Sequence, residues 1–75
     1  MKVVKYYSIK GTPKEKLLSL PCVLEIRPVG NSWCVILKDN TRCSKDDYLV
    51  KFESGIWQRF GAVAFQNLNR RGESL

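Results

Sequence analysis

The sequence predicts a small α+β domain: a curved antiparallel sheet or open barrel of about five strands, with one short helix after the first strand and a C-terminal helical turn. Segments rich in β-branched and aromatic residues recur along the chain, and Gly, Asn, Asp and Ser residues separate them. One segment with leucines at helical spacing, flanked by prolines, interrupts that series. With 75 residues the chain has the size of one domain with a small core.

The first strand is expected at residues 3–9, where β-branched and aromatic residues predominate. A helix follows because three start signals agree: Thr12 can cap it, Pro13 fits the first helical position, and Glu15 can reach back to the cap. Pro21 ends this helix after about two turns. The side chains expected to face the core are those of Leu17, Leu18 and Leu20.

Further strands are expected at residues 23–29, 33–38, 41–43, 48–53 and 56–60. In the first of these, Leu24 and Ile26 face one side of the strand, while Glu25 and Arg27 face the other. The turn residues at 30–32 and 54–55 indicate hairpins. Residues 62–68 have the spacing of a helical turn, which completes a single domain at residues 1–69, and residues 70–75 resemble a flexible polar tail.

The chain is basic: 13 Lys and Arg residues stand against seven Asp and Glu residues, and the net charge at pH 7 is +6. Most of the excess lies in residues 1–20, where five lysines accompany one glutamate. A basic domain attracts polyanions such as nucleic acid, an acidic membrane surface or an acidic protein face. Solubility alone also accounts for this charge, because small domains commonly carry a net charge of about 2–8.

The chain lacks residues and motifs that are common in enzymes, metal sites and phosphate-binding loops. The chain contains no histidine, which removes the commonest general base and metal ligand. It also has no Gly-x4-Gly-Lys phosphate loop and no zinc or calcium motif. The adjacent carboxylates Asp46 and Asp47 point to opposite sides of an extended chain, so we expect a polar corner there rather than an acid–base pair. The sequence therefore predicts a protein that is not an enzyme and binds no cofactor or metal.

The three cysteines form no C-x-x-C pair, and an odd number of thiols cannot all pair within one chain. Such usage is typical of the reducing cytosol. Cys22 and Cys34 lie in apolar strand patterns and are expected in the core. Cys43 lies beside Arg42 and close to Lys45, a basic neighbourhood that favours a thiolate. Because no apolar run approaches the roughly 18 residues of a membrane span, we expect a cytoplasmic protein with no membrane contact.

Residues 46–57, with the sequence D-D-Y-L-V-K-F-E-S-G-I-W, resemble a module found in small phage and prophage proteins. That module reads roughly G-D-Y-I-V-x-G-x-x-G-E-x-Y, and a Phe follows it three or four residues before an aromatic or apolar position, as Phe65 and Leu68 do here. Such proteins often begin with a strand, a Gly and a short leucine-containing helix, to which residues 4–20 are similar.

Three of the departures from the module concern its glycines and its acidic residue. Asp46 replaces the turn glycine, Phe52 replaces the glycine after the strand, and Ile56 replaces the acidic residue after the hairpin glycine. The family brings no agreed activity with it. The resemblance implies a phage-like accessory protein that acts in the cytosol of a bacterium.

The eight aromatic residues are more than a core of this size can enclose. Tyr6 and Tyr7 are adjacent, so one is expected to face the core and the other solvent. Exposed aromatics beside Lys and Arg suit base stacking on a single strand and are equally typical of protein–protein hot spots. The alternative is that they fill both faces of a curved sheet. The residues expected to contact a partner are Tyr7, Lys10, Lys14, Lys16, Trp33, Arg42, Trp57 and Arg59.

Two functions of different classes are compatible with these features. The first is a phage-type accessory protein that attaches to a host protein or nucleoprotein assembly with an acidic face and modulates or inhibits it. The alternative is direct binding of single- or double-stranded nucleic acid by a basic aromatic sheet face, although no zinc finger, helix-turn-helix or ribonucleoprotein motif is present. Pairing of exposed strand edges in a homodimer is a third reading, so both monomer and homodimer remain open.

Overall fold

The computed structural model describes residues 2–70. Within these residues the elements are β1 (Val3–Ser8), α1 (Lys14–Leu18), β2 (Val23–Val29), β3 (Ser32–Leu37), β4 (Arg42–Cys43), β5 (Tyr48–Phe52), β6 (Trp57–Phe60) and α2 (Ala62–Arg70). The predicted tail lies outside the described residues except for Arg70, which ends α2. Both predicted hairpins form, because Gly30 and Gly55 supply the positive φ values of 59° and 92° that their turns require.

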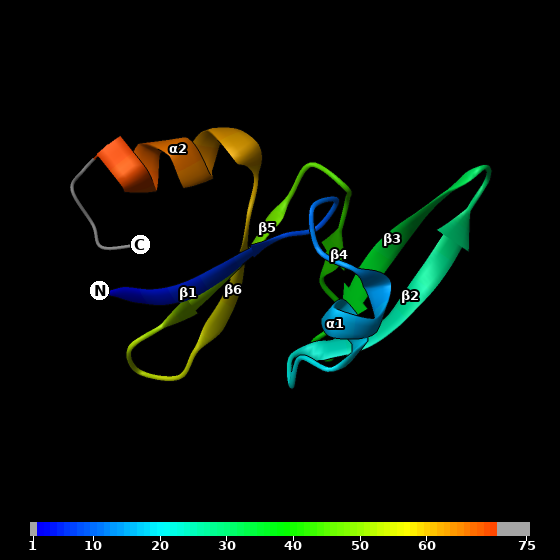
Figure 1. Cartoon of the computed structure of the whole chain (residues 1–75), viewed down its shortest axis with the longest axis horizontal. Helices are drawn as coiled ribbons and strands as arrows, with labels where there is room; N and C mark the ends of the chain where they lie inside the picture. Colours follow the sequence, from blue (N-terminus) through cyan, green and yellow to red (C-terminus); the bar gives the residue numbers. More distant parts are fainter. Residues whose placement is uncertain (1, 71–75) are drawn as a thin grey trace.

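The strands form two antiparallel sheets: sheet A has the order β1-β5-β6, and sheet B has the order β2-β3-β4. Figure 1 shows the two sheets side by side along the long axis of the molecule, which extends 37 Å. The α+β class is therefore confirmed, whereas the predicted single sheet or open barrel of about five strands is wrong. The chain turns at residues 44–47, and beyond this turn β5 pairs with the distant β1 rather than with β4.

Two core clusters hold these elements together. The larger cluster lies where α1 meets both sheets, and it contains Ile9, Leu17, Leu20, Val23, Val35, Leu37, Cys43 and Leu49. The smaller cluster packs α2 against one face of sheet A, and it contains Val3, Val50, Phe52, Phe65 and Leu68. In Figure 1 α2 accordingly lies along sheet A, while α1 lies beside sheet B. The face of sheet A opposite α2 therefore meets the larger cluster.

Helix α1 has five residues, fewer than predicted, and its start differs from the prediction. Thr12 makes no cap: its hydroxyl donates to the carbonyl oxygen of Ser8 at 2.6 Å, and Pro13 takes the N-cap position. Leu17 is fully buried, but Leu18 is 53% exposed, contrary to its predicted place in the core. A helix of this length presents only one narrow face to the core, and Leu17 occupies it.

Strand β2 also departs from its predicted alternation. Leu24 is 52% exposed, whereas Ile26, predicted to face the same side, packs against the larger core cluster, because the β2–β3 register shifts between Val23 and Glu25. β2 is an edge strand of sheet B and contains Pro28. Since proline has no backbone N–H, it weakens the pairing of this edge with a further strand.

Candidate functional site

The face of sheet A opposite α2 collects basic and aromatic side chains. In β5, Val50 and Phe52 belong to the cluster under α2, so the alternating residues Leu49 and Lys51 lie on the opposite face. In the antiparallel register, Lys51 lies between Lys5 of β1 and Trp57 of β6. Leu49 likewise lies between Tyr7 of β1 and Arg59 of β6. Paired residues share a face. The residues that share this face are therefore Lys5, Tyr7, Leu49, Lys51, Trp57 and Arg59.

Tyr7 and Trp57 form a stacked aromatic pair on this face. Their ring centroids lie 6.1 Å apart and their planes differ by 20°. Their strands, β1 and β6, are separated by β5 and so lie roughly 9–10 Å apart, which means that the rings lean toward each other across β5. Both side chains are half-buried and pack against the larger core cluster. The core therefore fixes the pair, while part of each ring stays accessible.

Three lysines surround this pair. The Nζ atoms of Lys5 and Lys16 lie 5.5 and 5.9 Å from the centroid of Tyr7, and Nζ of Lys51 lies 5.8 Å from that of Trp57. These distances are within the range of cation–π attraction. We refer to Lys5, Tyr7, Lys16, Lys51 and Trp57 as the Trp57 cluster.

The lysines of the Trp57 cluster have no ion-pair partner within the described part of the chain. Among the described residues, the ion pairs join Lys10 to Asp46, Arg27 to Glu25 and Arg59 to Asp47. Within residues 2–70 no carboxylate lies within 4.0 Å of the ammonium groups in the cluster. The face therefore offers an anion a concentrated positive potential beside aromatic rings.

A second basic aromatic group lies on sheet B. Trp33 of β3 is half-buried, and the Nζ atoms of Lys14 and Lys45 lie 4.9 and 5.4 Å from its ring centroid. We refer to these three residues as the Trp33 cluster. Beside it is an open groove of about 380 Å³, to whose lining Val29, Arg42 and Ser44 contribute together with Trp33 and Lys45.

The structure thus divides the eight predicted contact residues into three groups. Tyr7, Lys16 and Trp57 come together in the Trp57 cluster, while Lys14, Trp33 and Arg42 lie at the groove on sheet B. Lys10 and Arg59 instead form ion pairs within the molecule. Sequence reasoning missed Lys5, Lys45 and Lys51.

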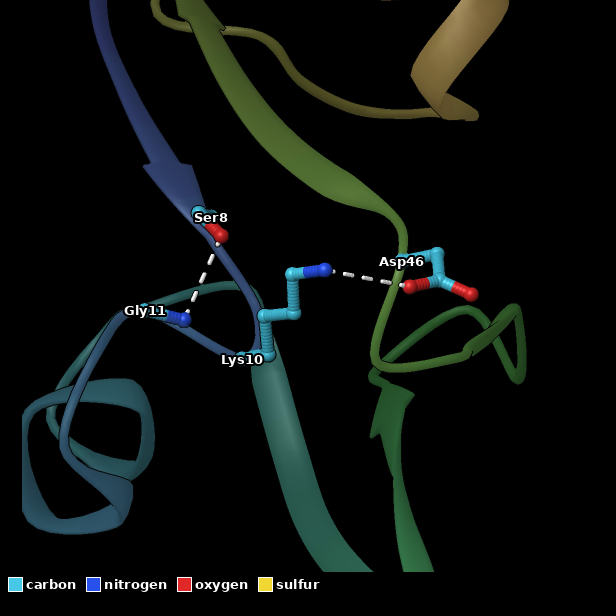
Figure 2. Close-up of polar contacts among 4 residues, drawn as sticks. All are labelled: Ser8, Lys10, Gly11 and Asp46. Carbon is cyan, nitrogen blue, oxygen red and sulfur yellow. Dashed lines mark hydrogen bonds and ion pairs between the residues drawn. The ribbon is translucent and has the colours of Figure 1, made fainter.

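Lys10 connects the end of β1 to the turn before β5. Figure 2 shows its Nζ directed toward Asp46, with 3.5 Å between Nζ and Oδ1. In the same view the backbone N–H of Gly11 donates to Oγ of Ser8 at 3.2 Å, which tightens the turn after β1. The ion pair is exposed to solvent, with 66% and 78% of the two side chains accessible, so it adds little stability.

Arg59 has a structural role that the sequence did not predict. Its Nη1 atom lies 3.0 Å from Oδ2 of Asp47, and that oxygen also accepts a hydrogen bond from the backbone N–H of Ser44 at 2.9 Å. Asp47 is only 8% exposed. The interpretation of Asp47 as a corner residue that satisfies a local amide is confirmed. Because Ser44 follows β4 and Arg59 belongs to β6, this carboxylate also links the two sheets.

The predicted basic neighbourhood of Cys43 does not make its thiol reactive. Cys43 is fully buried in the larger core cluster, and this burial, reinforced by the negative charge of Asp47, raises the pKa of its thiol to about 12. Burial also raises the pKa of the half-buried Cys22. Cys34 is buried as predicted, and all three cysteines are free.

The described part of the chain adds three findings about other kinds of site. Residues 2–70 contain no group of three or more Cys, Asp or Glu side chains that could hold a metal ion. No helix in this range has the length and apolar character needed to cross a bilayer. A second open pocket of about 260 Å³ lies beside Trp57, lined also by Pro21, Cys22 and Lys38.

Comparisons with protein-family models, with curated proteins and with solved structures return no match to this chain.

Proposed function

We propose that this chain is a non-enzymatic protein that binds single-stranded nucleic acid through the Trp57 cluster. The observation that carries the proposal is the gathering of three lysines, which have no ion-pair partner within residues 2–70, around a stacked Tyr–Trp pair on one face of sheet A. Lysines neutralise phosphates and release counterions. Aromatic rings fixed beside these lysines can stack with the bases, whatever the nucleotide sequence.

The same geometry favours a single strand over a duplex. Tyr7 and Trp57 are half-buried, so their rings are held close to the sheet and do not project from it. Duplex bases are stacked on one another and offer only their edges to the grooves, whereas a single strand can lay its bases against such rings. The lysines at the rim of the pair then lie where the sugar–phosphate backbone runs.

The test is fluorescence anisotropy of labelled oligonucleotides titrated with the protein over a range of salt concentrations. We expect micromolar or tighter binding of single strands, weaker binding of the matching duplex, and a log–log salt slope of about −2 for the three lysines of the cluster. Equal binding of single strand and duplex would contradict stacking on the aromatic pair. No binding at low salt would contradict the proposal.

The second candidate is an accessory protein that attaches to a host protein or nucleoprotein assembly with an acidic face. The observation that favours it is that the phage-like module, residues 46–57, contains Lys51 and Trp57 of the cluster. Trp and Tyr are also frequent anchors of protein interfaces. This function places the protein in the bacterial cytosol. Nuclease-resistant capture of one bacterial protein, without oligonucleotide binding, would favour this candidate.

A further inference from the structure

We propose that the groove beside Trp33 is a second nucleotide-binding site, and that one single strand occupies it together with the Trp57 cluster by passing over α1. This inference rests on the proposed function. It extends the contact of the ligand from one sheet to both, and it assigns to α1 the role of connecting the two clusters.

The groove repeats the chemistry of the Trp57 cluster. Trp33 packs against the larger core cluster on one side and is open to the groove on the other. The volume of the groove, about 380 Å³, lies within the range of small-ligand pockets. Lys14 and Lys45 reach the ring, and the exposed Arg42 lines the groove near them.

The carboxylate that lines this groove, Asp46, forms an exposed ion pair with Lys10. Among the groove's lining residues the acidic one is Asp46, and Nζ of Lys10 lies 3.5 Å from its Oδ1. Within residues 2–70 no carboxylate lies within 4.0 Å of Lys14, Lys45 or Arg42. The groove therefore presents to a phosphate three cations that have no ion-pair partner in the described part of the chain, and the guanidinium among them can bind it through two hydrogen bonds.

Helix α1 supplies one lysine to each cluster. Lys14 and Lys16 are two residues apart, and at about 100° per residue their side chains leave the helix on opposite flanks, on either side of the buried Leu17. On one flank Lys14 reaches Trp33, and on the other Lys16 reaches Tyr7. An α-helix is about 10–12 Å wide with its side chains, so only a few nucleotides are needed to pass over it.

The larger core cluster also fixes the two ends of this path relative to each other. Tyr7, Trp33 and Trp57 all pack against it, although they come from different sheets. A strand that leaves the Tyr7–Trp57 pair thus meets Lys16, crosses the outer face of α1, where the exposed Glu15 lies between the two lysines, and then meets Lys14 and the ring of Trp33. The expected site size lies within the range of about 4–16 nucleotides that small single-strand binding domains cover.

The chain contains two tryptophans, one in each cluster, so each can report on its own site. In a Trp33→Phe protein, fluorescence quenching reports binding at Trp57 alone, while the phenylalanine keeps an aromatic ring in the groove. This protein is titrated with oligo-dT of about three and about twelve nucleotides. The same titrations are repeated after Lys14, Arg42 and Lys45 are replaced by glutamine.

If one strand joins the two clusters, the glutamine substitutions weaken binding of the longer oligonucleotide, read at Trp57, by at least about tenfold. They leave binding of the trinucleotide, read at the same tryptophan, within about twofold, because a ligand that short stays in one cluster. The control replaces Lys2 by glutamate and Arg27 by glutamine, which lowers the net charge by the same three units outside both clusters and should weaken neither oligonucleotide to that extent. Lys10 is kept because it pairs with Asp46 at the groove.

The proposal is overturned if the groove substitutions and the control weaken the longer oligonucleotide equally, or if they weaken the trinucleotide as much as the longer one. It is also overturned if, in a Trp57→Phe protein, a glutamate-rich peptide quenches Trp33 and oligo-dT does not, since the groove then serves a protein ligand. If oligo-dT quenches Trp57 and the groove substitutions do not weaken its binding, this proposal is wrong and the proposed function is still supported. Absence of quenching of both tryptophans at low salt contradicts both proposals.

Discussion

Replacing Lys5, Lys16 and Lys51 together by glutamine is expected to weaken the binding of single-stranded oligonucleotides about 100-fold at about 0.1 M salt. Each lysine that neutralises a phosphate of a single strand contributes roughly 0.7 to the log–log salt slope, so the slope should also fall by about two. All three ammonium groups lie within 6 Å of a ring of the stacked pair and have no carboxylate partner among the described residues. Anisotropy titrations measure both quantities.

The matched control again replaces Lys2 by glutamate and Arg27 by glutamine, since both residues lie outside the clusters and the net charge falls by the same three units. We expect this protein to keep most of the affinity and most of the salt slope. If the cluster variant and the control lose affinity equally, net charge rather than the Trp57 cluster determines binding. Thermal unfolding of both proteins shows whether either loss reflects misfolding.

Replacing Asp47 by alanine is expected to lower the free energy of unfolding by about 2–3 kcal/mol. The substitution removes the acceptor shared by Arg59 and the backbone of Ser44, and it leaves that amide without its partner in the turn between the sheets. The Arg59 side chain is 40% exposed and so regains some hydration, which keeps the loss below that of a fully buried pair. In a domain of this size the melting temperature should fall by about 10–20 °C.

The neighbouring carboxylate provides the control. Asp46 forms an exposed ion pair with Lys10 at 3.5 Å, so replacing Asp46 by alanine should cost less than about 0.5 kcal/mol. Circular dichroism during thermal and urea unfolding measures both variants. A loss of similar size in the two proteins would show that Asp47 does not join the sheets in the way described.

Local patterns were sufficient to place the strands because each depends on residues close in sequence. The hairpins at Gly30 and Gly55 formed where their turn residues predicted them. The division into two sheets depends on β5 pairing with β1, a contact between distant segments that no local pattern specifies. The register shift that exposes Leu24 cannot be predicted from local sequence patterns either, since it depends on how β3 pairs with β2.

The candidate site was predictable in its residue types but not in its grouping. Trp57 and Tyr7 could be named from the sequence, because the chain has more aromatics than its core can enclose. Lys51 alternates with the buried Val50 and Phe52, and Lys5 lies in an exposed stretch of β1, so each looks, taken alone, like part of a solvated strand face. Only the register that aligns them with Trp57 shows that they belong together.

Ion pairs formed within the molecule are the other feature that the sequence does not reveal. Lys10 and Arg59 are basic and near the surface, so composition made them contact residues. Their partners, Asp46 and Asp47, are adjacent in the turn between the sheets and far from both in sequence. Whether a basic side chain is free or paired depends on such tertiary contacts.

The most direct measurement of the central claim is photocrosslinking of the protein to a single-stranded oligonucleotide that carries 4-thiothymidine, followed by mass spectrometry of the crosslinked peptides. Tyr6 and Tyr7 provide an internal comparison, because adjacent residues of a strand face opposite sides of the sheet. The ring centroid of Tyr6 lies 5.0 Å from that of Phe65 in α2, whereas Tyr7 stacks on Trp57. Tyr6 is also 45% exposed, so it is available to a ligand on its own side. We predict crosslinks at Tyr7 or Trp57. Crosslinks at Tyr6 without either of these would contradict binding by the face of sheet A opposite α2.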